Sequence, residues 1–335
     1  MRVAVDAMGG DHGPRVVVEG AVAAARASGV PVTLVGPIGL LQAELSLYPD
    51  ATRLDLRLVD ADEVVGMGES PAQALRRKPR ASITVAAGLV ARGDAAALFS
   101  AGNTGATVMA AHGAFGLLKG AERPALAATV PTERGVAVLV DVGANANCRP
   151  QHLVTFGVMG SAFASVVFGL ERPAVGLLSI GEEASKGNRL TREAHGLLRA
   201  TALRFIGNVE ARDLYSGAAD VVVCDGFTGN VAIKVSEGLV AMVDALLTRE
   251  SSVAADGRPG DELLRAAFEH VRRRVDYSEY GGAPLLGVGA ACIVGHGRSS
   301  VSAVRNAVRL AHRFAAEGLV ARLEQDLQTM RGTPS

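Results

Sequence analysis

Short runs of consecutive apolar residues alternate along the chain with longer stretches in which apolar residues recur every three or four positions. Runs that are apolar at every position indicate strands covered on both faces, and the longer stretches have the spacing of amphipathic helices. The alternation predicts an α/β fold, with a mostly parallel sheet and helices on both of its faces. The predicted strands are 3–9, 30–36, 54–60, 95–101, 136–143, 174–181, 204–210, 220–226 and 292–295.

The final third of the chain departs from this alternation. A long helix is predicted over about 229–250, a polar turn follows at 255–261, and a second helix runs to Arg274. A glycine-rich segment, 280–300, then precedes an amphipathic helix that is predicted over about 301–330. Two consecutive helices with no strand between them indicate an excursion from the layered α/β core.

The length and hydrophobicity of the chain indicate one large folded unit. With 335 residues, 49% of them hydrophobic, it can bury a sizeable core. We expect one α/β domain over 1–330, divided at most into two lobes, with the helical excursion at about 229–274 and a disordered tail at 331–335. The uncharged segment 153–170 approaches the length of a membrane span. Its Gly, Ser and Ala content and its lack of Trp and Tyr favour a helix buried in the core or at a subunit contact.

Charge and cysteine content narrow the functional classes. Lys and Arg together number 34, as do Asp and Glu, so the net charge is zero and no basic excess suggests a nucleic-acid partner. Three scattered cysteines, Cys148, Cys224 and Cys292, suit a reducing compartment and no disulfide framework. The first apolar run begins next to Arg2, where a secretory signal would show a longer apolar segment. We therefore expect a protein of a reducing compartment.

Polar turns follow most of the predicted strands at the point where each strand ends. Because the carboxyl ends of parallel strands share one edge of a sheet, where ligands bind, we expect these turns to converge. Several of them also open a helix, and backbone N–H groups at a helix start bind anions. Each turn taken singly has an ordinary explanation as a strand end or helix cap, but the set predicts a site for phosphate or another oxyanion. The turns are 9–14, 102–105, 145–147, 181–188, 227–230 and 296–300.

Familiar catalytic motifs are missing from the sequence. It has no P-loop, no G-x-G-x-x-G after a strand, no G-x-S-x-G elbow and no HExxH helix. We therefore expect neither a nucleotide cofactor nor a metal. Cys224 lies in an apolar run and is expected to be an inert core residue. His195 and His312 fall within helices as surface or packing residues, and His12 is the histidine expected at the ligand edge.

Six segments in the same order resemble the bacterial phosphate acyltransferases. They are MGGDHGP, SAGNTGA, DVGANANCRPQHL, GEEASKGN, CDGFTGNVAIK and YGGAPLLG, and they extend over most of the chain. The resemblance implies an isocitrate/isopropylmalate-dehydrogenase-like fold. It also implies an acyltransferase of phospholipid synthesis that makes long-chain acyl phosphate from acyl-acyl-carrier-protein and inorganic phosphate, without a cofactor. A membrane glycerol-3-phosphate acyltransferase would take the product, and the enzyme would be a cytoplasmic homodimer that associates with the membrane surface.

The candidate site residues follow from joining this chemistry to the polar turns. Phosphate is itself a nucleophile, so the protein has to position it and stabilise the tetrahedral oxyanion. Lys186, Asn103 and Asn230 are the candidate catalytic donors, although Lys186 also has the simpler explanation of a solvated loop lysine beside a glutamate. The candidate phosphate- and substrate-binding residues are Gly10, Asp11, His12, Gly13, Ser100, Gly102, Thr104, Gly105, Asn145, Asp225, Thr228 and Gly229.

Two further surfaces are expected to serve the partners that the resemblance implies. An acidic acyl carrier protein needs a basic face, which Arg76, Arg77, Lys78 and Arg80 could supply, with 272–274 as a second basic run. The segment 238–247 carries apolar residues on most sides. It would contact either the membrane surface or a second subunit.

Three alternative functions remain open at this point. A dehydrogenase of the same fold would need aspartates clustered around a divalent metal, and no predicted helix carries an Asp-x-x-x-Asp pair. A phosphotransacetylase would perform nearly the same reaction with coenzyme A and an acetyl group. A non-catalytic protein that binds the carrier protein would have no use for an anion site.

Overall fold

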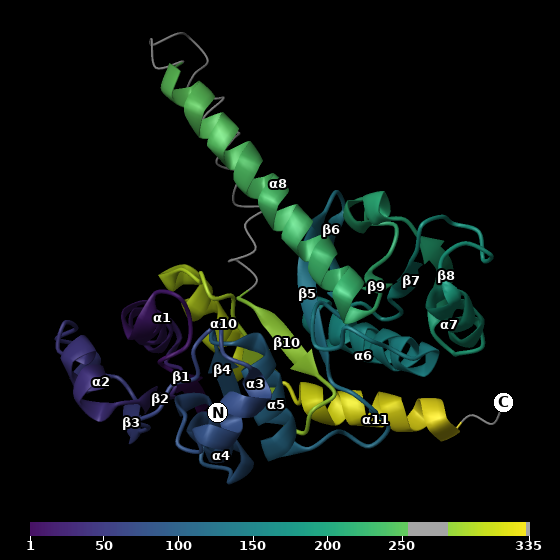
Figure 1. The fold of residues 1–335 in the computed structure, drawn as a ribbon. Helices are drawn as coiled ribbons and strands as arrows, with labels where there is room; N and C mark the ends of the chain where they lie inside the picture. The colour runs from purple at the N-terminus through teal and green to yellow at the C-terminus, as the bar shows by residue number, and fades with distance from the viewer. Residues whose placement is uncertain (254–280, 333–335) are drawn as a thin grey trace.

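The computed structural model describes residues 1–253 and 281–332. Eleven strands form one sheet in the order β3-β2-β1-β4-β11-β10-β5-β6-β9-β7-β8, with helices on both sides of it (Figure 1). The strands are β1 Val3–Asp6, β2 Val32–Gly36, β3 Leu56–Asp60, β4 Ala97–Ser100, β5 Ala125–Thr132, β6 Gly135–Val140, β7 Ala174–Leu178, β8 Arg204–Val209, β9 Val221–Val223, β10 Ala283–Leu286 and β11 Ala291–Val294. All nine predicted strands are present, whereas β5 and β10 were not predicted.

The two unpredicted strands divide the sheet into halves that point in opposite directions. β10 pairs antiparallel with both β11 and β5, and β5 pairs antiparallel with β6. Every other pairing is parallel. Three reversals therefore separate β11 from β6, and the carboxyl ends of β1, β4 and β11 lie at the edge opposite to those of β6, β9 and β7. The expectation that all six polar turns share one edge was wrong for this reason.

Two apolar layers cover the faces of the sheet. Along β1, Val3 and Val5 join the hydrophobic cluster that includes residues of α1 (Gly13–Ser28) and α10 (Val301–Ala316). Ala4 joins the cluster on the opposite face, with residues of α4 (Ser82–Ala91) and α5 (Thr104–Phe115). Burial of both faces explains why the strands are apolar at consecutive positions. The other helices are α2 Ile38–Leu45, α3 Pro71–Arg77, α6 Pro150–Phe168, α7 Arg189–Arg199, α8 Gly226–Val253 and α11 Leu319–Gly332, with short 3₁₀ turns η1 Ala51–Arg53 and η2 Ala211–Tyr215.

The apolar segment predicted as a buried helix is α6. Among the described residues, this helix alone has the length and hydropathy to cross a bilayer, and 61% of its most apolar window is buried inside the fold. Phe156 and Phe163 on α6 are both almost fully buried. The segment therefore has the environment of a core helix, as expected from its composition.

The C-terminal third is partly as predicted. The long helix is α8, which leaves the body of the molecule (Figure 1). The expected second helix to Arg274 lies outside the described residues. The final amphipathic stretch forms two helices, α10 and α11, because Gly318 between them has a φ of +68° that favours glycine. Of the tail expected to be disordered, 331 and 332 belong to α11, and 333–335 lie outside the described residues.

Candidate functional site

Three loops of the first half converge at the carboxyl edge of β1, β4 and β11. The Asp11 backbone N–H donates to the Gly297 carbonyl over 2.7 Å, which joins the loop after β1 to the loop after β11. A Cβ atom at Gly9 would come within 2.5 Å of the Gly102 nitrogen, so only glycine allows the loops after β1 and β4 to approach this closely. The convergence predicted from the polar turns therefore holds within this half of the sheet.

A buried carboxylate holds two of these loops together. Ser100 Oγ donates to Asp6 Oδ2 over 2.7 Å and accepts from the Gly102 N–H over 3.1 Å. Asp6 is 3% exposed and Ser100 is fully buried. Burial raises the pKa of Asp6, while its hydrogen bonds with Ser82 and Ser100 oppose that shift. Ser100, predicted to bind a ligand, thus shapes the loops at the ends of its own and the neighbouring strand.

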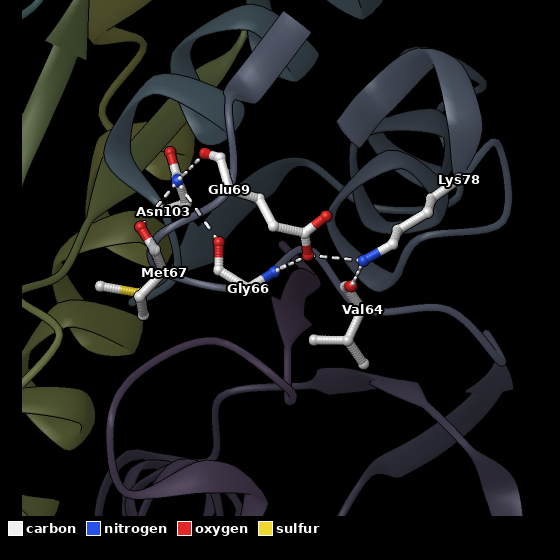
Figure 2. A network of polar contacts seen from close by, with 6 residues as sticks. All are labelled: Val64, Gly66, Met67, Glu69, Lys78 and Asn103. Carbon is white, nitrogen blue, oxygen red and sulfur yellow. Dashed lines mark hydrogen bonds and ion pairs between the residues drawn. The ribbon is translucent and has the colours of Figure 1, made fainter. Parts of the chain in front are cut away.

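Asn103 fastens a third segment to the start of α5. Its Nδ2 donates to the carbonyls of Gly66, Met67 and Glu69 at 3.4, 3.0 and 3.0 Å (Figure 2). Its Oδ1 accepts from the Ala106 N–H over 3.1 Å, so the same side chain caps the helix. Asn103, predicted as a catalytic donor, is therefore placed to position the loop 66–69.

The same network contains part of the predicted docking patch. Glu69 Oε1 accepts from Lys78 Nζ over 2.5 Å and from the Gly66 N–H over 2.7 Å, and Lys78 Nζ also donates to the Val64 carbonyl (Figure 2). Arg80 pairs with Asp62 over 2.7 Å and with Asp60 over 3.3 Å. Arg76 and Arg77, by contrast, are exposed at the end of α3. Of the four predicted docking residues, Arg76 and Arg77 are therefore the two that form no ion pair with a carboxylate of the described residues.

A second group of predicted residues gathers at the opposite edge of the sheet. Asp141 accepts from the backbone and side chain of Asn145 over 2.7 and 2.8 Å, and both residues are buried. Asp225 accepts from the N–H and hydroxyl of Thr228, an arrangement typical of a helix start. Asn230 Nδ2 donates to the Val142 carbonyl over 3.2 Å. These side chains shape the loops where β6 ends and α8 begins.

Between the two edges lies a cavity of about 670 Å³, within the usual range for a small-molecule site. Its walls come from β5, α8, the start of β10 and the loop after β11. Many of the lining side chains are apolar, including Leu126, Val130, Ile233, Leu239 and Val240. The cavity thus extends across one face of the sheet, with residues of both halves around it.

Three ionisable side chains meet within this cavity. Lys234 Nζ on α8 lies 2.9 Å from Glu237 Oε2 and 2.7 Å from His296 Nε2, and the carboxylate lies 3.6 Å from the same ring nitrogen. Burial and the Lys234 ammonium lower the pKa of His296, although Glu237 opposes the shift. This cluster was not predicted from the sequence. The spacing of Asn230, Lys234 and Glu237, four and three residues apart, could have indicated one polar helix face.

The predicted site residues are therefore divided among several places. Asp11, Thr104 and Asn230 line the cavity. Lys186 is exposed in the loop after β7, where its backbone N–H donates to the Glu183 carbonyl, and it does not line the cavity. The remaining predicted residues belong to the two groups of loops, at 10–13 and 100–105 on one edge, and at 145 and 225–229 on the other.

The described residues give little evidence of a metal site or of a reactive thiol. Within 1–253 and 281–332, no group of three His, Cys, Asp or Glu side chains could hold a metal ion. Burial raises the pKa of Cys224 well above the ordinary value and that of Cys292 to about 12, which leaves both as unreactive thiols. His195 contacts Asn208 and Phe205, and His312 contacts the Met1 carbonyl, so both serve packing as expected.

Comparison with known proteins identifies the fold. A phosphotransacetylase from Streptococcus pyogenes has a TM-score of 0.63 at 16% identity, over 95% of this chain and 94% of that one. The 4-hydroxythreonine-4-phosphate dehydrogenase from Klebsiella pneumoniae has a TM-score of 0.54 at 16% identity, over 94% and 99%. The molecule is therefore an α/β protein of the fold that phosphotransacetylases share with dehydrogenases of this type.

Sequence comparison then identifies the family. Residues 1–322 match the family described as "Fatty acid synthesis protein". A "Phosphate acyltransferase" of Citrifermentans bemidjiense is 50% identical over 327 residues, which cover 98% of this chain and 93% of that protein. The chain belongs to the phosphate acyltransferase family. It is an acyl-transferring enzyme of lipid synthesis, and an acyl substrate and phosphate are what this reaction requires.

Proposed function

We propose that the enzyme transfers a long-chain acyl group from acyl carrier protein to inorganic phosphate, and that the acyl phosphate feeds glycerol-3-phosphate acylation at the membrane. The observation that carries this proposal is the cavity, which joins apolar walls on β5 and α8 to the polar cluster of Lys234, Glu237 and His296. An acyl chain needs the apolar walls, and phosphate needs the polar groups.

The reaction balances without a protein nucleophile. An unprotonated oxygen of hydrogen phosphate attacks the thioester carbonyl, the new C–O bond forms and the C–S bond breaks. The proton of the hydrogen phosphate ends on the departing thiolate sulfur. The protein has to align the two reactants and stabilise the tetrahedral oxyanion. Because burial raises the pKa of Cys148 to about 11, this thiol is a poor candidate for a covalent intermediate.

The size and character of the cavity favour a long acyl chain over an acetyl group. About 670 Å³ lies within the range of sites for drug-sized ligands, and an acetyl group would leave most of the apolar wall without contact. On α8, the apolar lining consists of Ile233, Leu239 and Val240. This argues for a fatty acyl donor rather than for the phosphotransacetylase reaction.

The exposed face of α8 suits the proposed assembly of two subunits at a membrane surface. Its apolar stripe recurs every three or four residues and is at least 47% exposed at each position, a pattern that fits a second helix or a lipid surface better than water. The stripe consists of Phe227, Val231, Val235, Leu239, Met242 and Leu246. In a homodimer, the second subunit would cover one part of the stripe, and a membrane would contact another part.

The donor assignment is tested by comparing two acyl thioesters with the purified enzyme. Acyl phosphate is trapped with hydroxylamine, and thiol release is measured with palmitoyl carrier protein or acetyl coenzyme A as donor, in phosphate buffer. We expect phosphate-dependent thiol release with the palmitoyl donor and little with the acetyl donor. The reverse preference would assign the enzyme to the phosphotransacetylases. Reduction of a nicotinamide cofactor by hydroxy acids, followed by absorbance, would instead support a dehydrogenase.

A further inference from the structure

The loop between β3 and α3 places an exposed methionine at the wall of the cavity. Met67 is 42% exposed and lines the cavity together with Asp11 and Thr104. A Cβ atom at Gly297 would come within 2.7 Å of Met67 Cε, so the methionine packs directly on the loop after β11. A methionine side chain is apolar and unbranched, and it adapts its shape to an apolar ligand. Met67 therefore offers an apolar contact beside the polar loops of the first half of the sheet.

Side chains from outside the loop 66–69 hold this methionine in place. Asn103, which caps α5, donates to three backbone carbonyls of the loop (Figure 2). Lys78 Nζ, directly after α3, donates to Glu69 Oε1 over 2.5 Å and to the Val64 carbonyl over 2.7 Å. Water can satisfy the carbonyls of a surface loop, so these contacts are not needed to satisfy the backbone. Their effect is to fix the position of Met67.

α3 connects the loop 66–69 to the exposed arginines of the predicted docking patch. A Cβ atom at Gly105 would come within 2.6 Å of Pro71 Cγ, so the start of α3 packs closely on α5. From Pro71 the helix runs about 10 Å, at 1.5 Å per residue, to its end at Arg77. Arg76 and Arg77 are exposed there. The cavity contact and the docking charges therefore belong to one hydrogen-bonded unit, with a short helix between them.

We infer that Met67 is a specificity-determining contact for the acyl donor, and that Asn103 is a positioning residue that acts through Met67. A carrier protein docked at Arg76 and Arg77 would pass its acyl thioester over the loop 66–69 into the cavity, and Met67 would contact the acyl chain at this entrance. The inference rests on the proposed function, because it takes an acyl thioester of the carrier protein as the donor. Phosphate makes no apolar contact, so its binding should not depend on Met67.

The first test removes the methionine side chain. Initial rates of thiol release are measured with palmitoyl carrier protein as the varied substrate, and then with phosphate varied. Met67→Ala should raise the KM for the palmitoyl donor by about 3–30-fold, the effect of losing the contacts of one apolar side chain, and should leave the phosphate KM unchanged. Met109→Ala is the matched control, because Met109 is 45% exposed on α5 and does not line the cavity. A normal donor KM for Met67→Ala would overturn the inference.

The second test separates positioning from folding. Asn103→Ser keeps an oxygen that can cap α5 but removes the amide that donates to the three carbonyls. It should raise the donor KM by about 3–10-fold. In the Met67→Ala background the same substitution should change the donor KM by less than about 2-fold, because the contact through which Asn103 acts is already lost. Asn188→Ser, at the cap of α7, is the control and should leave the donor KM unchanged.

The two hypotheses fail in different ways. An unmodified enzyme that releases no thiol from palmitoyl carrier protein in phosphate contradicts the proposed function. An active unmodified enzyme whose Met67→Ala variant keeps a normal donor KM contradicts only the role of Met67. If Asn103→Ser raises the donor KM equally with and without the Met67 side chain, Asn103 does not act through Met67. Because Met67 is exposed, its replacement should leave the fold intact, and circular dichroism of each variant checks this.

Discussion

Lys234 Nζ on α8 and His296 Nε2 in the loop after β11 lie 2.7 Å apart, although 62 positions separate them in the sequence. α8 follows β9 in the second half of the sheet, and β11 belongs to the first half. The contact therefore joins two sets of strands that point in opposite directions. It brings polar side chains from both halves to one point of the cavity, which neither half encloses alone.

Two lysines can be compared directly as phosphate ligands. Both side chains are exposed to a large extent, but Lys234 lines the cavity, whereas Lys186, the lysine predicted from the sequence, lies in the loop after β7 outside the cavity lining. We expect Lys234→Ala to lower kcat/KM for phosphate by about 10²–10³-fold, the usual effect of removing one donor to an oxyanion, and Lys186→Ala to have a much smaller effect. Thiol release at varied phosphate concentration measures both. The reverse order would restore the role predicted for Lys186.

Asn103 is predicted to contribute more stability than an ordinary helix cap. Asn103→Ala removes a cap that typically contributes about 0.5–2 kcal/mol, and it also removes the hydrogen bonds to three carbonyls of the loop 66–69. Asn188→Ala is the control, because Asn188 caps α7 by accepting from Thr191. The free energy of unfolding, measured in urea, should fall by about 1–3 kcal/mol more for Asn103→Ala than for Asn188→Ala. Equal losses would mean that the loop contacts contribute nothing.

His152 should make stability fall as the solution becomes acidic. Burial, together with Arg149 and Arg123, lowers the pKa of His152 from its ordinary value of 6.5, although Glu122 opposes the shift. Between the folded pKa and 6.5 the unfolded chain binds more protons than the folded one, so stability is lost as pH falls through this window.

The measurement is the midpoint of urea unfolding at several pH values. His152→Gln should flatten the decline between about pH 6.5 and 5, and the slope that persists would include the contribution of His296, whose pKa is also lowered. His112→Gln, an exposed control, should keep the full slope. If His152→Gln also keeps the full slope, other groups cause the acid sensitivity.

The docking patch can now be tested with two of its four residues. Lys78 and Arg80 are paired with carboxylates, whereas Arg76 and Arg77 are exposed. Reversing Arg76 and Arg77 to Glu should raise the KM for the carrier protein and weaken its dependence on salt, because the acidic partner would lose its attraction. The phosphate KM should stay unchanged. A constant KM for the carrier protein would place its docking surface elsewhere.

The apolar stripe of α8 gives a prediction about assembly. If the proposed homodimer uses this stripe, Val235→Glu combined with Leu246→Glu should shift the enzyme toward monomer in sedimentation, because each exposed apolar side chain would be replaced by a charge. The same variant is then tested for flotation with anionic vesicles. A variant that stays dimeric but no longer floats would assign the stripe to membrane contact.

The sequence indicated the layered α/β core because that core depends on local and periodic features. Burial on both faces requires consecutive apolar residues in the strands, which made β1, β4 and β9 recognisable. β5 and β10 escaped because each contains a proline, Pro131 or Pro284, and proline weakens the signal of a strand. Because these two strands were not predicted, the reversal of the sheet was not predicted either. All the polar turns were therefore expected at one edge.

The site could be predicted only in part for the same reason. The turns after β1, β4 and β11 are brought together by parallel pairing, which the sequence pattern implied. Contacts across the fold decide whether a side chain faces a ligand or a neighbouring loop. Asn103 contacts Met67, and Ser100 contacts Asp6.

By itself, the sequence determined the class of fold, the buried nature of α6 and the family, because periodicity, composition and ordered motifs are properties of the chain alone. Only the tertiary structure decided which charged groups share the cavity. Lys234 and His296 become neighbours because three antiparallel pairings turn the second half of the sheet around and bring the first turns of α8 beside the loop after β11. This contact depends on the direction of strands that are far apart in the chain, so a local sequence pattern cannot predict it.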